Sequence, residues 1–464
     1  MTIETAAFGE LTLPDLLSRP RAEVRALQDR LLRRTIALCH RGHPHYQRVM
    51  RERGLAPADV QTTDDLVKLP ITSKQDFMAD PEAFRLQLPD LPPEERILRE
   101  VMYTTGTTSG RPAPIYTTTW DHYAFLFQAA RCSDILGLRD TDVIANVFPL
   151  TPFPMGAYVR ADAIAAANGA AIVTVNPGRP SPSFPVHRGL DEAVRTVERH
   201  RATIIWGVAS FVRRMLIRAN ELGADFSCVR MCSITGEVTS KAMREDMRRR
   251  LADLGSTAAR ILNRYGSTEM IAGMLECVEG SGWHNPAPDQ MFLEIVDPET
   301  GRRVGNGERG LVLMTHLIRR GTVLLRYAVG DVVAMTDEPC PHCGRTAERL
   351  VTQPARTGDL VKIKGMLVNL DLLQEELDAV RGLEEYQIVI QKSDPADPFS
   401  MDELVLRLAA NDGAAQAVAR EGAERTAAAA QVQPRLEIVR RDEIFDPTKS
   451  PKLQRIVDRR PTLQ

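Results

Sequence analysis

The residues that most directly suggest chemistry lie in one polar stretch, Tyr103–Pro112, which reads Tyr-Thr-Thr-Gly-Thr-Thr-Ser-Gly-Arg-Pro. Its eight central positions, Thr104–Arg111, carry no large apolar side chain. Gly106 and Gly110 allow positive φ and a close approach of the backbone to a ligand. A concave run of N–H donors and hydroxyls that ends in a cation, here Arg111, suits a phosphate. The spacing is not that of a P-loop, so an ordinary loop is the alternative.

Two further motifs place carboxylates after apolar segments. Tyr265–Glu269 (Tyr-Gly-Ser-Thr-Glu) follows the apolar pair Ile261–Leu262, and open parallel sheets bind ligands where their strands end. The carboxylate, hydroxyls and glycine of this motif can hold Mg²⁺ and a phosphate. Asp331 ends the motif Arg326–Asp331, and its carboxylate can accept both hydroxyls of a ribose. Each motif taken alone is also compatible with a simple turn.

The last two candidate motifs lie nearer the C-terminus. Arg356–Asp359 (Arg-Thr-Gly-Asp) precedes Lys362–Gly365 (Lys-Ile-Lys-Gly), and a Gly/Asp pair between two domains is typical of a hinge. Lys452 lies in a basic tail and would be functional only if this end of the chain swings over a nucleotide. The alternatives are an inert linker and solvated surface charge.

In this order and with these gaps, the five motifs resemble those of the adenylate-forming superfamily of acyl-CoA synthetases, adenylation domains and luciferases. Within it, the chain is most similar to the phenylacetate–CoA ligase branch. Three features carry that similarity: the shortish length, Gly236-Glu237, and the ending Lys-x-x-Arg-Ile-x-Asp. The resemblance covers about residues 60–460. It implies an ATP-dependent acid–CoA ligase acting on an aromatic carboxylate, with an acyl-adenylate intermediate and release of pyrophosphate and AMP.

The same resemblance implies roles for individual residues. Thr268 would contact the α-phosphate, Glu269 would hold Mg²⁺, and Asp331 would bind the ribose hydroxyls. Lys452 would bridge the carboxylate and the α-phosphate, because Lys⁺ and Mg²⁺ offset the repulsion between the acid and the triphosphate. The remaining nucleotide-binding residues implied are Thr104, Thr105, Gly106, Thr107, Thr108, Ser109, Gly110, Arg111, Gly236, Glu237, Tyr265, Gly266, Ser267 and Arg356. After a swing of the C-terminal domain, Lys364 and Gly365 would replace Lys452 at the CoA channel.

The chain departs from the family pattern at three places. Arg111 replaces a lysine, which keeps the charge and adds a bidentate fork. Gly358 stands at the hinge where the family has an acidic residue or lysine, and Pro451 replaces a glycine, which leaves Lys449 as an alternative to Lys452. Two other interpretations therefore stay open. One is an adenylating enzyme with a carrier protein, an amine or an inorganic nitrogen nucleophile as acceptor. The other is a nucleotide-binding scaffold that has lost catalysis.

Four further residues suggest a metal site. Cys340 and Cys343 form a Cys-x2-Cys knuckle with the spacing of a zinc site. Cys277 and His284 would complete a Cys3His tetrahedron, and the resemblance to phenylacetate–CoA-ligase-like proteins implies such a zinc. His342 competes with His284 for the last position. A complete set of four ligands leaves no open position, so the zinc would be structural. Reduced cysteines without metal are the alternative.

The acyl site is the least specified part of the chain. The resemblance places it along residues 148–158, rich in proline and aromatic side chains, and along the strand end 206–210. An aromatic ring could lie between side chains of this region. The candidate substrate residues are Phe148, Phe153, Trp206, Ser210 and Ile234. A role in the hydrophobic core is an equal alternative for them.

Alternating strands and helices must position these motifs. Strands are expected over 142–148, 170–175, 202–206, 229–234 and 258–262, and helices over 158–168, 190–200, 211–222 and 240–254. Such alternation predicts parallel βαβ units. Short strands at 291–296, 310–314 and 322–325 indicate a β-rich subdomain. The expected fold is α/β: a large N-terminal domain (1–354) with parallel-type αβ layers and a β-rich subdomain (about 285–352), a hinge (355–359), and a small mobile α+β C-terminal domain (360–464).

The amino-acid composition limits the classes of partner that we expect for this chain. The chain has 464 residues, 43% of them hydrophobic and 26% charged, which fits a globular protein of more than one domain. With 59 basic and 61 acidic residues the net charge is −2, which argues against a nucleic-acid partner. The N-terminus lacks the features of a signal peptide, and no apolar run is long enough to span a membrane. We therefore expect a cytoplasmic protein without a membrane partner. A homodimer is among the oligomeric states left open.

Overall fold

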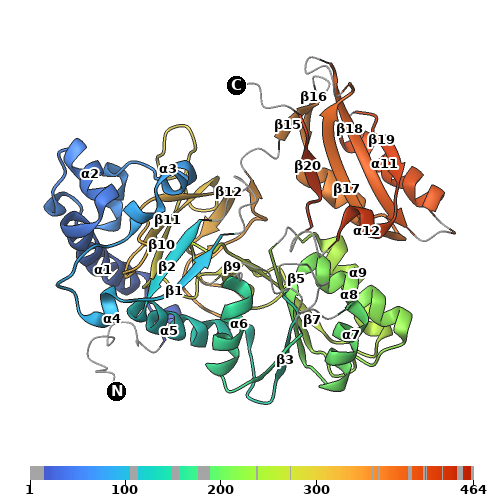
Figure 1. The fold of residues 1–464 in the computed structure, drawn as a ribbon, viewed down its shortest axis with the longest axis horizontal. Helices are drawn as coiled ribbons and strands as arrows, with labels where there is room; N and C mark the ends of the chain where they lie inside the picture. Colours follow the sequence, from blue (N-terminus) through green and yellow to red (C-terminus); the bar gives the residue numbers. More distant parts are fainter. Residues whose placement is uncertain are drawn as a thin grey trace.

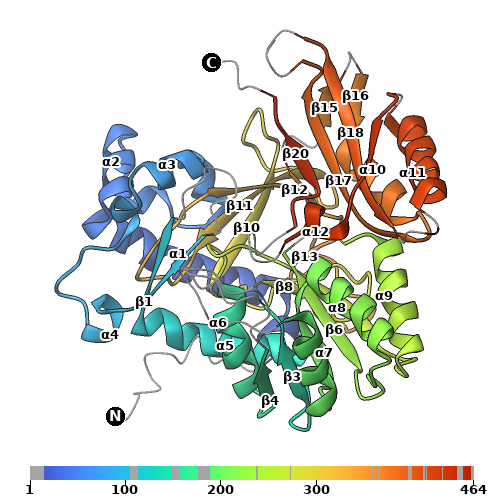
Figure 2. The same cartoon turned by 45° about the vertical axis from the view of Figure 1, so that its right-hand side comes forward.

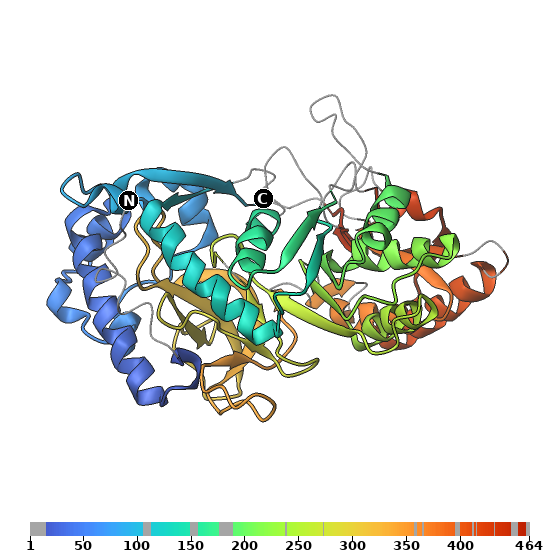
Figure 3. The ribbon, with the colours of Figure 1, turned by 90° about the horizontal axis from the view of Figure 1, so that it is seen from below.

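The structure is a computed structural model. It describes residues 15–104, 113–148, 156–175, 189–236, 239–271, 273–356, 360–363, 366–394, 400–410, 413, 415–430, 432–446 and 453–460. The N-terminal helices (blue) and the outer part of the C-terminal residues (orange) lie at opposite ends of the molecule (Figure 3).

One 12-stranded sheet runs through most of the chain. Its order is β10-β11-β12-β13-β9-β8-β7-β6-β5-β3-β4, and β14 pairs with β12 (Figure 1). The strands of its parallel part are β3 (Val143–Asn146), β4 (Ala171–Thr174), β5 (Ile204–Val208), β6 (Met231–Thr235) and β7 (Arg260–Tyr265). The helices between them and next to them are α5 (Thr119–Leu136), α6 (Gly156–Ala166), α7 (Leu190–Arg199), α8 (Ala209–Leu222) and α9 (Lys241–Asp253). These elements confirm the predicted βαβ alternation.

The other part of this sheet is antiparallel. Its strands are β8 (Met274–Leu275), β9 (Trp283–His284), β10 (Met291–Val296), β11 (Arg309–His316), β12 (Tyr327–Thr336), β13 (Arg349–Leu350) and β14 (Ala355–Arg356). A separate antiparallel pair, β1 (Leu98–Tyr103) and β2 (Pro114–Thr118), flanks the polar stretch. The first helices are α1 (Arg21–Gly42), α2 (Pro44–Glu52), α3 (Lys74–Ala79) and α4 (Pro93–Arg96). Ser73 caps α3 through a hydrogen bond from the amide of Asp76, which satisfies a free N–H at the helix start.

The strand expected over 322–325 is absent from the structure. Val323, Leu324 and Leu325 are fully buried, so the apolar run is genuine, but it crosses the core as an irregular segment. Its backbone bonds go to several partners: Val323 N–H donates to the Phe84 carbonyl, and Leu325 N–H donates to the Tyr46 hydroxyl over 2.6 Å. A buried segment can satisfy its polar groups in this way without joining a sheet.

The described residues from 360 onward form a body with its own core, the C-terminal unit (Figure 2). Its elements are β15 (Leu360–Ile363), β16 (Met366–Asn369), α10 (Leu370–Asp378), β17 (Leu383–Lys392), β18 (Asp402–Ala410), α11 (Ala415–Ala430), β19 (Arg435–Ile438), α12 (Arg441–Ile444) and β20 (Ile456–Asp458). Four of the strands form a sheet in the order β19-β18-β17-β20, and β15 pairs with β16. The unit lies beside α8 and α9 (Figures 1 and 2). The α/β fold class predicted from the sequence is confirmed.

Candidate functional site

Two of the predicted motifs meet at the carboxyl end of β7. The Tyr265 hydroxyl donates a hydrogen bond to Asp331 Oδ2 over 2.9 Å. Tyr265 ends β7 and Asp331 lies in the middle of β12, so the bond joins the parallel and antiparallel parts of the sheet. Arg356 on β14 is the register partner of Asp331. The structure therefore brings Tyr265, Asp331 and the backbone of Arg356 together, as the motifs require.

Glu269 is held by two residues to which the sequence assigned no role. Its Oε1 accepts a hydrogen bond from the Tyr327 hydroxyl over 3.0 Å, and its backbone carbonyl lies 2.9 Å from His316 Nε2. His316 Nδ1 accepts from the amide of Leu324 over 3.1 Å, so the imidazole is neutral with its proton on Nε2. Burial lowers the pKa of His316 to about 3. These contacts fix the position of a carboxylate that is only 5% exposed.

The backbone around this carboxylate adopts unusual conformations. Ile271, two residues after Glu269, has a φ of 69°, which is a genuine outlier for a β-branched residue. At Gly273 an added Cβ would lie 2.7 Å from the carbonyl oxygen of Tyr265, so only glycine fits there. Gly236, after β6, has a φ of 89°. Outliers of this kind concentrate at functional sites, where the surrounding structure compensates for the strain.

Of the polar stretch, the structure describes only Tyr103 and Thr104. Thr104 N–H donates to the Ala113 carbonyl over 2.9 Å, and Thr104 Oγ1 accepts from the Ala113 amide over 2.9 Å. The loop base is thus clamped by two reciprocal bonds. Nine predicted loop and hinge-side positions lie outside the described residues: Thr105, Gly106, Thr107, Thr108, Ser109, Gly110, Arg111, Lys364 and Gly365. Phe153, Glu237 and Lys452 lie outside them as well.

The four predicted acyl-site residues that the structure describes, Phe148, Trp206, Ser210 and Ile234, are buried but do not all share a face of the sheet. Trp206 pairs in register with Ser233, and Gly207 pairs with Ile234. Side chains of register partners share a face and successive side chains alternate, so Trp206 and Ile234 lie on opposite faces. Trp206 and Ile234 therefore do not line the same face of this sheet, and the roles of the predicted acyl-site residues stay a prediction. Phe148 and Ser210 are each 1% exposed.

The four predicted metal ligands form a cluster. One ligand atom from each of Cys277, His284, Cys340 and Cys343 lies within 4.8 Å of the others. The Cys277 and Cys340 sulfurs are 3.9 Å apart, and Cys343 Sγ is 3.6 Å from His284 Nε2. A tetrahedron with Zn–S and Zn–N bonds of ordinary length has edges of about 3.8 Å and about 3.6 Å. The cluster therefore has the ligand types of a Cys3His metal site, with His284 rather than His342 as the fourth member, and these two distances match the edges of a zinc tetrahedron.

The cluster connects three separate segments. Cys277 follows β8, His284 ends β9, and the two remaining cysteines lie in the turn after β12. Burial lowers the pKa of His284 to about 3, so the imidazole is in the neutral form that binds metals. Burial raises the pKa of the Cys277 thiol to about 11. A bound cation would reverse that shift, because a coordinating thiol is deprotonated.

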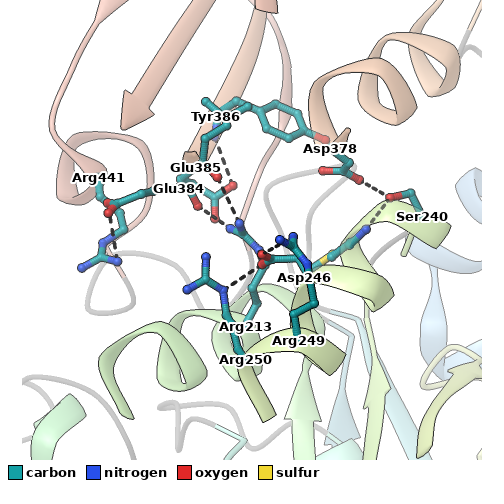
Figure 4. A network of polar contacts seen from close by, with 12 residues as sticks. Arg213, Ser240, Asp246, Arg249, Arg250, Asp378, Glu384, Glu385, Tyr386 and Arg441 are labelled. Atoms are coloured by element: carbon teal, nitrogen blue, oxygen red, sulfur yellow. Dashed lines mark hydrogen bonds and ion pairs between the residues drawn. The ribbon is translucent and has the colours of Figure 1, made fainter. Parts of the chain in front are cut away.

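A polar network joins the C-terminal unit to the rest of the chain (Figure 4). Arg213, on α8, donates to the backbone carbonyl of Leu383 over 3.0 Å and to that of Glu384. Its Nε donates to Asp246 on α9 over 2.8 Å. Ser240 Oγ donates to Asp378 Oδ2 of the C-terminal unit over 2.6 Å. The interface is therefore held by charge-assisted hydrogen bonds, which are stronger than neutral ones.

Arg455 organises the other side of this interface. Its guanidinium lies 3.1 Å from Glu385 and 3.3 Å from Asp378. It also stacks over the Tyr386 ring at 4.6 Å from the centroid. Arg455 follows the predicted catalytic lysine by three positions in the sequence. The chain just after Lys452 is thus anchored within the C-terminal unit, next to α9.

Comparisons with known proteins agree with this architecture. Residues 41–321 match the family described as AMP-binding enzyme. That match covers more than half of the chain, so the protein belongs to the AMP-binding enzyme family. The phenylacetate-coenzyme A ligase of Thermus thermophilus is 27% identical over 389 residues, which are 83% of this chain and 82% of the relative.

Two crystal structures of 2-hydroxyisobutyryl-CoA ligase have the same fold. The post-adenylation state with R3-HIB-AMP superposes with a TM-score of 0.77 at 21% identity. The thioesterification state with 2-HIB-AMP and CoA gives a TM-score of 0.61 at 22% identity. Both comparisons cover 97% of this chain and 94% of the other. Among the described residues, no helix has the length and apolarity needed to cross a bilayer.

Proposed function

We propose that the protein is an acid–CoA ligase. It activates a carboxylic acid with ATP as an acyl-adenylate, releases pyrophosphate, and transfers the acyl group to CoA with release of AMP. The observation that carries the proposal is the hydrogen bond from Tyr265, the last residue of β7, to Asp331, with the buried carboxylate of Glu269 held by Tyr327 four residues further along the chain, in a chain of the AMP-binding enzyme family. The similarity to phenylacetate-coenzyme A ligases over most of the chain supports CoA as the acceptor.

The site residues follow from this reaction. Asp331, oriented by Tyr265, accepts the ribose hydroxyls, with Arg356 beside it. Glycines of the polar stretch and Gly236 let the backbone approach the nucleotide. Thr268 contacts the α-phosphate, and Lys452 stabilises the charge that develops as the acid attacks it. The other nucleotide contacts are those implied above for residues 104–111, Glu237, Gly266 and Ser267.

Two metal ions belong to this proposal. Glu269 would hold Mg²⁺ through the carboxylate that Tyr327 orients, since Mg²⁺ in such sites binds one or two carboxylates together with substrate phosphates. The ion would supply neutralisation of the triphosphate charge. Cys277, His284, Cys340 and Cys343 would hold a structural zinc, which the tetrahedral dimensions of the cluster support. It would fasten the turn after β12 to β9.

The C-terminal unit would act as a mobile lid. In this proposal residues 1–354 bind the nucleotide and the acid, residues 355–359 are the hinge, and residues 360–464 form the lid. The higher TM-score to the post-adenylation state than to the thioesterification state supports the described arrangement as the one that follows adenylation. Rotation of the lid would remove Lys452 and bring Lys364 and Gly365 to the CoA channel.

The acid substrate is proposed to be aromatic. The phenylacetate-coenzyme A ligases among its relatives support that class, as does the aromatic content of residues 148–158. Purified protein, MgATP and a panel of aliphatic and aromatic acids test the proposal through pyrophosphate and AMP release, with and without CoA. CoA-dependent thioester and AMP formation with an aromatic acid is expected. Adenylation without transfer to CoA would reject the acceptor, and no pyrophosphate release with any acid would reject the reaction.

A further inference from the structure

Polar side chains occupy one buried face of the central parallel strands. Asn146 pairs in register with Trp206, Trp206 pairs with Ser233, and Thr235 pairs with Arg264. Because register partners share a face, these residues line the same side of β3, β5, β6 and β7. Asn146 Nδ2 donates to the carbonyl of Tyr158 on α6, so α6 covers this side. Parallel strands are normally apolar on both faces, and a polar row here requires an explanation.

Arg264 is the charged member of that row. Its guanidinium carbon lies 4.3 Å from the centroid of the Trp206 ring, and the residue is 8% exposed. Its titratable neighbour is the thiol of Cys132 on α5, which stays protonated because burial raises its pKa to about 12. Within the described part of the chain, no carboxylate pairs with Arg264, and its Nε has no hydrogen-bond partner.

Two neighbouring polar groups also lack partners among the described residues. The indole N–H of Trp206 and the hydroxyl of Ser233 are buried and make no hydrogen bond within that part of the chain. Asn146 differs, because its amide oxygen accepts from the Phe148 N–H over 3.3 Å and its nitrogen is also bonded. The unused groups are therefore concentrated on β5, β6 and β7, and they are predominantly donors. Donors of this kind are complementary to an anion.

An unpaired buried cation is energetically unfavourable. Removing a guanidinium from water costs several kcal/mol unless a counter-charge and hydrogen bonds compensate. The stack on Trp206 offsets only part of that cost. A bound ligand that supplies the counter-charge and the hydrogen bonds would offset this cost. Arginine is suited to that task because its planar fork binds a carboxylate through two parallel hydrogen bonds.

We propose that Arg264, with the Trp206 N–H and the Ser233 hydroxyl, recognises a second carboxylate at the far end of the acid substrate. The inference rests on the proposed function and names its substrate class: dicarboxylic acids, in which one carboxylate is adenylated and the other stays ionised. Arg264 is a specificity-determining residue in this assignment.

The chemistry of the reaction places the bound carboxylate away from the reacting one. Adenylation converts the attacking carboxylate into a neutral ester-like carbonyl. If the buried guanidinium were paired with that carboxylate, it would lose its counter-charge when the acyl-adenylate forms. A remote carboxylate keeps its charge through both half-reactions. The three donor residues also lie within β5, β6 and β7, whereas the motif proposed to bind the nucleotide begins with the last residue of β7.

Matched pairs of acids test this inference. Benzoate is compared with terephthalate, and phenylacetate with 4-carboxyphenylacetate, by the kcat/KM for pyrophosphate release. The wild-type enzyme should prefer the dicarboxylate of at least one pair by about 100-fold, since truncating one partner of a buried, hydrogen-bonded charge pair weakens binding by about 30-fold or more. Arg264→Met should abolish this preference by lowering dicarboxylate turnover. Arg264→Lys, which keeps the charge but loses the fork, should restore part of it.

Arg260→Met is the matched control, because Arg260 lies on the same strand and bonds instead to the Leu136 carbonyl. It should leave the preference unchanged. Two results overturn the inference: a wild-type enzyme that uses monocarboxylates as well as or better than every dicarboxylate, or an Arg264→Met variant that loses activity on both kinds equally. The wild-type comparison decides the matter even if the variant fails to fold. Absence of pyrophosphate release with all acids would instead reject the proposed function.

Discussion

Arg213 holds the C-terminal unit in its described position, and its replacement by methionine should release that unit. The side chain is largely buried and donates to two backbone carbonyls of β17 across the interface. Methionine keeps the apolar stem and removes both bonds. Asp246, which also loses a partner, remains paired with Arg250 over 2.9 Å and with Arg249 over 3.2 Å. The effect should therefore be confined to the interface.

The size of the effect follows from the two bonds. Each hydrogen bond from a charged group contributes at least about 1.5 kcal/mol, so the loss is about 3 kcal/mol. That corresponds to about a 100-fold fall in the ratio of docked to undocked molecules. The lost arginine also leaves two carbonyls without hydrogen bonds in the docked state, which destabilises the docked state further.

Cysteine labelling measures this ratio. Met243, on α9, is 2% exposed, and its sulfur lies 3.9 Å from the Arg455 guanidinium. A Met243→Cys background reports undocking as alkylation of position 243, which peptide mass spectrometry separates from the native cysteines. Arg213→Met should speed this labelling about 100-fold. Arg250→Met, which removes an Asp246 partner without touching the C-terminal unit, is the control. Equal labelling rates in the two variants would refute the role of Arg213.

Three further predictions concern the metal cluster, the buried histidines and the late lysine. Cys340→Ser should reduce bound zinc from about one per chain to a minor fraction and lower the Tm; Cys39→Ser, a buried thiol outside the cluster, should keep its zinc, and equal zinc contents would contradict the site. Burial lowers the pKa of both His43 and His316 to about 3, below the unfolded value of about 6.5. Their contribution to stability is therefore complete above pH 6.5 and is lost as the pH falls towards 3, by about 1.4 kcal/mol per pH unit for each histidine. Denaturant titrations at pH 7, 6 and 5 give the free energy of unfolding at each pH. In His316→Gln this free energy should fall less steeply with falling pH than in the wild type, by about 1.4 kcal/mol per pH unit. An unchanged pH dependence would contradict the assignment of His316 as neutral. Lys452→Ala should slow acyl-adenylate formation by orders of magnitude and spare thioester formation from supplied adenylate, whereas Lys449→Ala should slow neither step; a reversed pattern would assign the role to Lys449.

Local patterns predicted the parallel part of the fold well. Strand β4 at 171–174 lies within the expected 170–175, and helix α7 at 190–199 closely matches the expected 190–200. The failures have a common cause. Strands β8, β9, β13 and β14 are two residues long, too short to show a period, and they exist because distant segments pair with them. The buried run 322–325 has strand-like composition, but its polar backbone is satisfied by residues far away in the sequence.

The candidate site divides in the same manner. The Tyr265–Asp331 bond joins two motifs that each carry a local signature. The metal cluster was predictable because Cys277 and His284, the partners of the Cys340–Cys343 knuckle, are residue types that bind metals. Tyr327 and His316 were not assigned roles because their importance comes from contact with Glu269, across 58 and 47 positions respectively. Arg264 illustrates the converse. In the sequence Arg264 is one of many arginines. Only its burial without a counter-charge, which the structure shows, distinguishes it as a candidate functional residue.

The bonds from Arg213 end on main-chain oxygens of Leu383 and Glu384, not on side chains. Amino-acid changes at those two positions leave the carbonyls in place, so the contact tolerates sequence divergence that a side-chain pair would not. A C-terminal unit transplanted from a distant homologue could therefore seat on α8 of this protein without redesign of the arginine. Under the proposed function, exchange of the C-terminal unit would recombine the adenylation and transfer steps of such enzymes.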